Sequence, residues 1–204
     1  YRVYTTVDSN FQQSANKAIV DGLIAYGERR GFKGASGRID PVLHDSTDKR
    51  IIELQKFPGV SNLQPVMVLR PGGDAIEILT STGIHKSLSS DSWRWTNKSP
   101  SQLLHPGDVV YLFKAETGAR LANIPKVQGA LVSLSPSDGS ILALTGGFSF
   151  RQSRFNRVTQ AQRQPGSNIK PFIYSSAIAN GFTASTLVSG APIVIEDSIG
   201  GAWR

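Results

Sequence analysis

Apolar residues recur at helical spacing in the first thirty residues of the chain. The positions that share one face of this helix are Phe11, Ala15, Ala18, Ile19, Leu23 and Tyr26. Ser9 and Gln12 have the spacing of a capping box at its start. Gly31 is the residue type that follows a helix end, so we predict a helix from Ser9 to about Arg30. The β-branched and aromatic run from Val3 to Val7 predicts a strand before it.

After Gly31 the pattern changes to short apolar runs between turns. A helix-like stretch around Lys49–Lys56 comes first, and Trp93 and Trp95 alternate with Arg94 as in a strand. The other predicted strands cover residues 65–70, 75–80, 109–114 and 120–124, and the first two are a hairpin candidate across the turn at 71–74. Several short strands separated by turns predict a small OB-like β-barrel or a sandwich over 33–127.

The clearest hairpin of the chain follows this β segment. Ala130 to Leu134 and Ile141 to Thr145 flank a turn rich in Ser, Pro, Asp and Gly. A polar, arginine-rich linker then leads to a predicted helix from Ile169 to Ala179. The first helix, the hairpin and this last helix all need partners for their apolar faces. We therefore predict an α+β chain, with one domain formed by 1–32 and 128–204 and a β domain, 33–127, inserted into it.

The composition is that of an ordinary globular protein, with 39% hydrophobic and 18% charged residues. There are no cysteines, which excludes disulfides and thiolate metal sites. His44, His85 and His105 have no paired carboxylate at ligand spacing, so we expect no metal and no cofactor. The net charge of +7 fits a surface for anionic glycan, lipid headgroups or nucleic acid, although a solvated basic face is the simpler interpretation.

The pattern Ser-x-x-Lys occurs three times, as Ser14–Lys17, Ser46–Lys49 and Ser167–Lys170. The first two lie in polar surroundings and are interpreted as chance. The third follows the turn Pro165-Gly166, which would place Ser167 at a helix start. There, free backbone N–H groups can stabilise a developing oxyanion.

Ser167 and Lys170 at this spacing suit a serine nucleophile with an amine beside it that takes the proton. Apolar residues after the motif could desolvate Lys170 and favour its neutral form. Pro171 disfavours helical geometry at Lys170, so we expect an irregular first turn, or a helix that begins near Pro171. The competing interpretation is an ordinary helix start without chemistry.

Residues 129–147, Phe155-Asn156-Arg157, Thr159-Gln160-Ala161 and Arg163 to Ser167 together resemble the start of the transpeptidase domain of class A penicillin-binding proteins, of the 1a type. The middle β segment is similar in position to the OB-like domain inserted in that type. The resemblance implies a penicillin-binding-protein/serine β-lactamase-like fold with Ser167 as acylated nucleophile and Lys170 as proton acceptor. It also implies the peptidoglycan stem peptide as substrate, β-lactams bound covalently at Ser167, and a place at the periplasmic face of the bacterial inner membrane.

Two further motifs of that family, Ser-x-Asn and Lys-Thr/Ser-Gly, do not follow Ser167. The one Ser-x-Asn in the chain, Ser14-Ala15-Asn16, lies upstream on the first predicted helix. We therefore expect this chain to be part of a longer protein. The remainder of the transpeptidase domain would be its partner, and these 204 residues alone would have little or no acylation activity.

A function of another class remains open at this point. The basic β domain could act as a non-catalytic binding module for a protein or for anionic glycan or nucleic acid, with Ser167 only capping a helix. Trp93 and Trp95 could stack on bases or sugars. Packing or contact with a periplasmic protein is the preferred interpretation of both rings, and we expect no nucleic-acid partner.

Overall fold

The computed structural model describes residues 1–43, 45–115, 118–191, 195–196 and 202–203. The chain divides into two compact units, Tyr1–Ala161 (unit 1) and Gln162–Arg204 (unit 2), which are described separately below. His44 lies outside the described residues. None of the helices in the described part of the chain combines the length and the apolar character that a membrane span needs.

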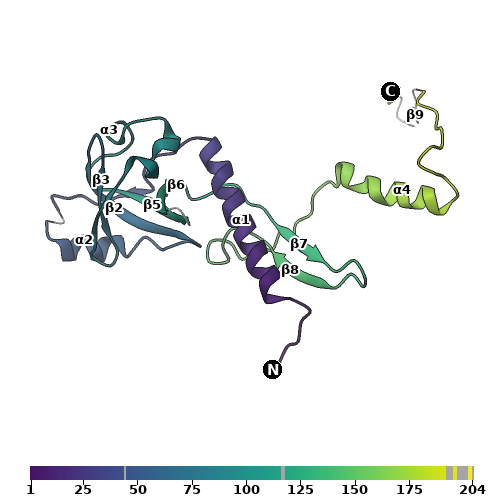
Figure 1. Cartoon of the computed structure of the whole chain (residues 1–204), viewed down its shortest axis with the longest axis horizontal. Helices are drawn as coiled ribbons and strands as arrows, with labels where there is room; N and C mark the ends of the chain where they lie inside the picture. The colour runs from purple at the N-terminus through teal and green to yellow at the C-terminus, as the bar shows by residue number, and fades with distance from the viewer. Residues whose placement is uncertain (44, 116–117, 192–194, 197–201, 204) are drawn as a thin grey trace. The chain divides into compact units, whose positions relative to one another are not determined.

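Unit 1 combines helices with a large and a small sheet (Figure 1). Its helices are α1 (Ser9–Arg29), α2 (Thr47–Leu54) and α3 (Pro100–Leu103), and its 3-10 turns are η1 (Ser90–Ser92) and η2 (Arg94–Thr96). Its strands are β1 (Gly37–Arg38), β2 (Leu63–Pro71), β3 (Ile76–Thr80), β4 (His85–Leu88), β5 (Asp108–Ala115), β6 (Gly118–Ala122), β7 (Leu131–Leu134) and β8 (Ile141–Thr145). Unit 2 holds η3 (Gly166–Ile169), α4 (Lys170–Ala179), β9 (Ile195–Glu196) and β10 (Ala202–Trp203).

The large sheet has six antiparallel strands and is open. Its order is β1-β5-β2-β3-β4, and β6 pairs with β5. β5 pairs with β2 along one edge, while its other edge pairs with β1 at Asp108–Val109 and with β6 beyond Tyr111. Among the described strands, no pairing joins β4 to β1 or β6. The predicted small OB-like barrel is therefore not closed, whereas the mixed helix and sheet class is confirmed.

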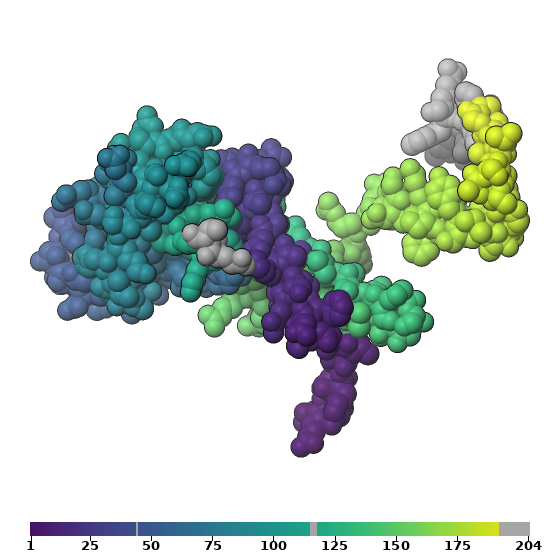
Figure 2. Space-filling view, in the orientation of Figure 1, coloured from purple at the N-terminus to yellow at the C-terminus, as the bar shows by residue number. Residues whose placement is uncertain are grey.

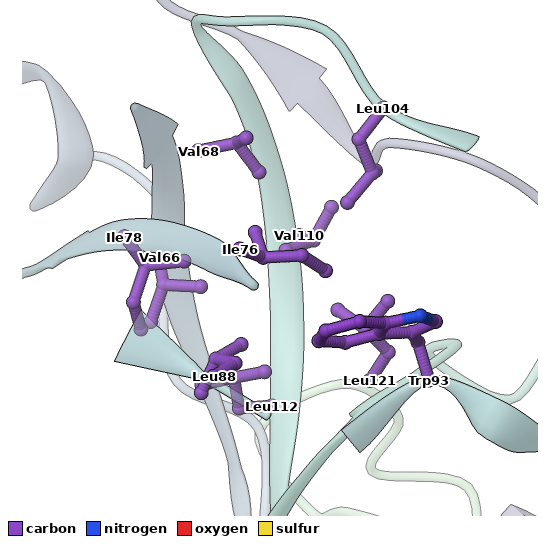
Figure 3. Close-up of a cluster of buried hydrophobic side chains, with 10 residues drawn as sticks. All are labelled: Val66, Val68, Ile76, Ile78, Leu88, Trp93, Leu104, Val110, Leu112 and Leu121. Carbon is purple, nitrogen blue, oxygen red and sulfur yellow. The ribbon is translucent and has the colours of Figure 1, made fainter. Parts of the chain in front are cut away.

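Both faces of this sheet are covered. One face carries a cluster of buried side chains, shown in Figure 3: Val66, Val68, Ile76, Ile78, Leu88, Trp93, Leu104, Val110, Leu112 and Leu121. The other face buries Met67, Leu79 and Val109 with Leu54 of α2. Because successive strand residues point to opposite faces, a stretch of strand covered on both sides is apolar without interruption, as residues 66–69 of β2 and 109–113 of β5 are.

The predicted Trp93-Arg94-Trp95 strand is wrong, because η1 and η2 occupy this stretch and Asn97 closes it at a φ of 56°. Trp93 is buried in the sheet cluster. Trp95 packs against that cluster, lies edge-on to Phe32 and donates from Nε1 to the Leu121 carbonyl at 3.0 Å. The rings therefore serve packing, and the stacking of bases or sugars on them is not supported.

Helix α1 connects the large sheet with the β7–β8 hairpin. Val20 and Ile24 pack with Leu63, Tyr111 and Phe113 of the sheet region. Earlier turns of α1 lie against β8 and β7. Figure 2 shows the solvent side of α1 running across the visible face of unit 1.

The start of α1 differs from the sequence prediction. Asp8 is the N-cap and its carboxylate accepts from the N–H groups of Asn10 and Phe11, so Ser9 already lies inside the helix. An Asp has the same capping chemistry as a Ser, which is why the sequence did not separate them. Gly31 follows the helix at a φ of +78°, as predicted.

The segment before α1 and the apolar face of α1 also need correction. Residues 3–7 form no strand and are exposed, although the Thr6 hydroxyl donates to the Ile141 carbonyl at 2.7 Å. The buried face of α1 carries Ala15, Val20 and Ile24, whereas Phe11 is 52% exposed. The buried face of α1 is turned relative to the predicted apolar stripe, because α1 packs against both the large sheet and the β7–β8 hairpin.

Candidate active site

Ser167 lies in η3, the single 3-10 turn that leads into α4. Gly166 has a φ of +53°, a conformation that glycine adopts without strain, and it turns the chain into η3. The Asn168 N–H donates to the Pro165 carbonyl, and the Lys170 N–H donates to the Ser167 carbonyl. The prediction that Pro165-Gly166 places Ser167 at a helix start is confirmed.

Lys170 is the first residue of α4 and has ordinary helical angles, φ −57° and ψ −41°, although Pro171 follows it. The tight η3 turn before it is the irregular first turn that Pro171 predicts. Side chains three residues apart eclipse in a 3-10 turn. Ser167 and Lys170 therefore project from the same side of the chain.

Nothing within the described residues engages or buries the Lys170 side chain. No hydrogen bond or ion pair joins it to another described residue, and both Ser167 and Lys170 are exposed. The apolar residues after the motif are also exposed, with Phe172 at 72% and Tyr174 at 63%. The desolvation that the sequence suggested for Lys170 is thus not provided by the described chain.

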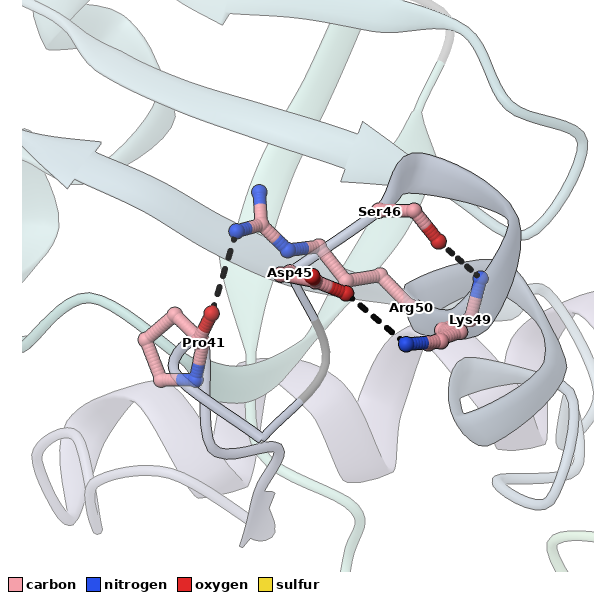
Figure 4. A network of polar contacts seen from close by, with 5 residues as sticks. All are labelled: Pro41, Asp45, Ser46, Lys49 and Arg50. Carbon is pink, nitrogen blue, oxygen red and sulfur yellow. Dashed lines mark hydrogen bonds and ion pairs between the residues drawn. The ribbon is translucent and has the colours of Figure 1, made fainter.

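The second copy of the motif, Ser46–Lys49, is a structural device (Figure 4). Ser46 is the N-cap of α2, and its Oγ accepts from the Lys49 N–H at 3.3 Å. The Lys49 Nζ is paired with Asp45 Oδ1 at 2.9 Å, and this hydrogen bond lowers the pKa of the Asp45 carboxyl below its ordinary value. Both side chains are already used, so this copy has no free nucleophile and base.

The first copy, Ser14–Lys17, lies on the outside of α1. Lys17 Nζ forms an ion pair with Asp21 Oδ2 at 2.7 Å, one helical turn further on. The interpretation of these two copies as non-catalytic is consistent with these contacts.

The chain before unit 2 is anchored to the end of β8 by a contact that the sequence analysis missed. The Arg157 N–H and its Nη1 donate to the Gly146 carbonyl at 3.1 and 3.3 Å. A Cβ on Gly146 would lie 2.8 Å from the Asn156 Cα, so only glycine allows this approach. The signal was present as a Gly-Gly pair at a strand end followed by an Asn-Arg pair, but a glycine pair was interpreted only as the end of the hairpin.

Gln12 is a second residue whose role the sequence did not reveal. Its side-chain amide pairs with the backbone of β8: Oε1 accepts from the Leu144 N–H at 3.0 Å and Nε2 donates to the Leu144 carbonyl at 3.1 Å. Asn16, one turn later, accepts from the Thr145 hydroxyl at 2.7 Å. The capping-box spacing had assigned Gln12 to its own helix, whereas it connects α1 to the edge of β8.

One ion pair links α1 to the large sheet. Glu28 Oε1 lies 3.0 Å from Arg120 Nε of β6, but the N–H is not directed for a hydrogen bond, so the contact is purely ionic. Partial burial raises the pKa of the Glu28 carboxyl, and the Arg120 charge acts in the opposite direction. Among the described residues, no group of three or more His, Cys, Asp or Glu side chains is arranged to hold a metal ion.

Comparisons with known proteins agree with these observations. A family model described as the penicillin-binding protein OB-like domain matches residues 32–127. The model of the penicillin binding protein transpeptidase domain matches residues 129–204, which include Ser167 and Lys170.

Three similar proteins show how far the likeness extends. Penicillin-binding protein 1A of Pseudomonas aeruginosa is 38% identical over 218 residues, and that of Escherichia coli K12 is 33% identical over 219. Each alignment covers 100% of this chain and 26% of the relative. The crystal structure of penicillin-binding protein 1A from Haemophilus influenzae superposes with a TM-score of 0.85 at 35% identity, covering 98% of this chain and 30% of that one.

The chain thus spans about a quarter of the length of these curated relatives. Its β region matches the OB-like model, and the hairpin, η3 and α4 lie in the segment that matches the transpeptidase model. The chain belongs to the penicillin-binding protein family, with 1A proteins among its relatives.

Proposed function

We propose that this chain is part of a serine D,D-transpeptidase that cross-links peptidoglycan. The Ser167 Oγ attacks the carbonyl carbon between the last two D-alanines of a stem peptide. The C–N bond breaks, the terminal D-alanine leaves as an amine, and an ester to Ser167 remains. An amine of a neighbouring stem then attacks this ester, forms the new peptide bond and returns the serine hydroxyl.

Lys170 is the proposed proton acceptor during the attack. It projects from the same side of the chain as Ser167, and no described residue occupies its amine. A neutral amine there takes the Oγ proton and can pass it to the leaving D-alanine nitrogen. N–H groups at the start of η3 are free of helix partners and suit the oxyanion that forms.

The observation that carries this proposal is the contrast between the three Ser-x-x-Lys copies. In the two copies on α1 and α2, the lysine is paired with an aspartate, and Ser46 also caps its helix. Only at Ser167–Lys170 are both side chains uncommitted within the described residues, and this copy lies in the segment that matches the transpeptidase model. The match to this model supports the reaction class.

The proposed enzyme needs more than this chain. Residues 1–32 and 128–204 would form part of the transpeptidase domain, with 33–127 inserted as the OB-like domain. The remainder of the domain would bury α4, desolvate Lys170 and supply the Ser-x-Asn and Lys-Thr-Gly residues. The protein would act at the periplasmic face of the inner membrane and would be a β-lactam target through Ser167, with the OB-like domain available to a periplasmic protein partner.

A cross-linking assay tests the proposal. The longer protein that contains this chain is incubated with a stem pentapeptide ending in D-Ala-D-Ala and an amine acceptor, and D-alanine and product are measured by mass spectrometry. Ser167→Ala should abolish both, and Lys170→Ala should lower the rate about 100- to 10,000-fold. Ser46→Ala is the matched control and should retain the rate. Cross-linking that persists in Ser167→Ala would overturn the proposal, and the 204 residues alone should show little or no activity.

A further inference from the structure

A cavity of about 880 Å3 lies within unit 1, where the end of α1 meets the connection from β6 to β7. One wall comes from the last turns of α1 and the linker after it. A second wall is the 123–128 segment, and the third is the loop after β8 with Gln152, Ser153 and Arg157. All of these residues belong to unit 1.

The cavity is strongly basic. Its lining includes Arg30, Lys33, Lys126 and Arg157, and none of the described residues that line it is an aspartate or glutamate. No ion pair within the described chain joins any of these four cations to a carboxylate. The described residues therefore leave the positive charge of the cavity without a neutralising carboxylate.

A second cavity of unit 1 shows that basic residues without a paired carboxylate are not general in this unit. That cavity, of about 730 Å3, is lined by Lys17 and Arg120 among others. Lys17 is paired with Asp21, and Arg120 is paired with Glu28. In that second cavity an acid thus pairs with two of the three basic lining residues, whereas no described ion pair involves the four cations of the cavity at the end of α1.

Hydrogen bonds fix the walls of the basic cavity before any ligand arrives. The Lys33 N–H donates to Asn123 Oδ1 at 2.9 Å, and Asn123 Nδ2 donates to the Gly31 carbonyl at 3.1 Å. The Arg30 guanidinium lies over the Tyr26 ring at 5.3 Å, a stacking that leaves its N–H edge available. Preorganised cations of this kind lose little entropy when they bind an anion.

The lining also suits a particular class of anion. Gln128 adds an amide NH2 group that no described hydrogen bond uses and that can bind a hydroxyl, whereas the guanidinium groups of Arg29 and Arg30 already lie over the Tyr26 ring. Arginine and lysine bind carboxylates with charge-assisted hydrogen bonds. A hollow of this size accepts a segment of a flexible polymer, whereas a flat membrane surface cannot enter it.

We propose that this cavity is a second binding site for the cell-wall polymer, in which the carboxylates of a stem peptide contact the cations and the attached sugar lies toward Gln128. The inference rests on the proposed function, because that function brings a carboxylated glycopeptide to this protein. The site would hold a strand against unit 1 without taking part in acyl transfer.

Binding of a disaccharide-tetrapeptide tests the site independently of catalysis. The longer protein is used with Ser167→Ala, and the tetrapeptide lacks the terminal D-alanine, so no acylation can contribute. Affinity is measured by calorimetry at low salt and again at about 0.5 M salt, where electrostatic binding should weaken. The test variant carries Arg30→Gln, Lys33→Gln and Lys126→Gln. The control variant removes the same charge at exposed positions elsewhere, with Lys86→Gln, Lys98→Gln and Lys114→Gln.

The test variant should bind the tetrapeptide at least about tenfold more weakly than the parent, while the control should change less than about twofold. Amidation of the tetrapeptide carboxylates should cause a similar loss. Equal affinity in the test variant and the parent, or no binding by the parent, would overturn the proposal. Preferential binding to vesicles of an anionic phospholipid would also overturn it, by assigning the cations to phosphate. The proposed function is tested separately, by measuring a β-lactam adduct on the longer protein that retains Ser167.

Discussion

Helices α1 and α4 both carry apolar side chains, but the chain treats them in opposite ways. α1 buries Ala15, Val20 and Ile24 between the large sheet and the β7–β8 hairpin. α4 buries none of its residues, and Ile173 and Ile178 are 56% and 64% exposed. One helix belongs to a packed core, and the other carries the proposed catalytic motif on an apolar surface that the described residues of its own unit do not cover.

The difference between the two helices indicates that the residues that stabilise the fold are not the residues proposed for the chemistry. The sheet core and α1 give unit 1 enough buried apolar area to hold its own fold. The Ser167–Lys170 pair lies where few described contacts fix its surroundings. We infer that the pair becomes reactive only when further protein packs around α4, because a site that excludes water strengthens the electrostatic interactions of the reacting groups.

Equivalent isoleucine truncations in the two helices give the largest expected contrast. Ile24→Ala removes a buried side chain that is 2% exposed and should lower the free energy of unfolding by about 2–5 kcal/mol. Ile173→Ala removes an exposed side chain and should cost less than about 0.5 kcal/mol in the 204-residue chain. Urea unfolding followed by the fluorescence of Trp93 and Trp95 measures both, and equal losses would contradict the comparison.

A smaller loss of stability is expected from a substitution at Gly146, where unit 1 anchors the chain that leads to unit 2. Gly146→Ala places a Cβ against Asn156 and should destabilise unit 1 by about 1–3 kcal/mol through overpacking. Gly73→Ala is the control, since no atom lies within 4 Å of its added Cβ. If both variants unfold at the same urea concentration, the close approach of Gly146 and Asn156 is not a constraint.

The same serine substitution distinguishes two Ser-x-x-Lys copies. Ser46→Ala removes the N-cap hydrogen bond of α2 and should cost about 1 kcal/mol of stability. Ser167 makes no side-chain capping bond in η3, so Ser167→Ala should leave the urea midpoint within error. A comparable loss in Ser167→Ala would mean that Ser167 has a structural role.

The smallest effect concerns the ion pair that joins α1 to the large sheet. Burial raises the pKa of Glu28 above its unfolded value of 4.5, so the folded state keeps the proton to higher pH than the unfolded state. Stability contributed by this group therefore falls as pH rises from about 4.5 through the raised pKa. Glu28→Gln should flatten the pH dependence of the urea midpoint in that window, whereas an unchanged slope would assign it to other groups.

The sequence predicted the regular elements better than their partners. The β7–β8 hairpin and the β2–β3 pairing were predicted because the period of apolar residues and the turn chemistry are local. The open sheet, the burial of Trp93 and the rotated face of α1 were not predicted, because each depends on which distant element packs against it. The same limit applied to Gln12, whose partner lies 132 residues away in β8.

At the candidate site, too, the local backbone could be predicted from the sequence, but the choice among the three motif copies could not. The start of α4 could be predicted, since Gly166 and Pro171 fix the local backbone. The motif alone could not separate Ser167–Lys170 from the copies at Ser46 and Ser14. Ser167–Lys170 was distinguished from these copies by the resemblance of the surrounding sequence to a known family and by the aspartates that pair with Lys17 and Lys49.

The most direct test of the account is the intact mass of the longer protein after incubation with a penicillin. The protein should gain the mass of one opened β-lactam, and peptide mapping should place the adduct on Ser167. Ser46→Ala should acquire the same adduct, and Ser167→Ala should acquire none. A persistent adduct in Ser167→Ala, or an adduct mapped to another residue, would contradict the assignment of Ser167 as the acylated nucleophile.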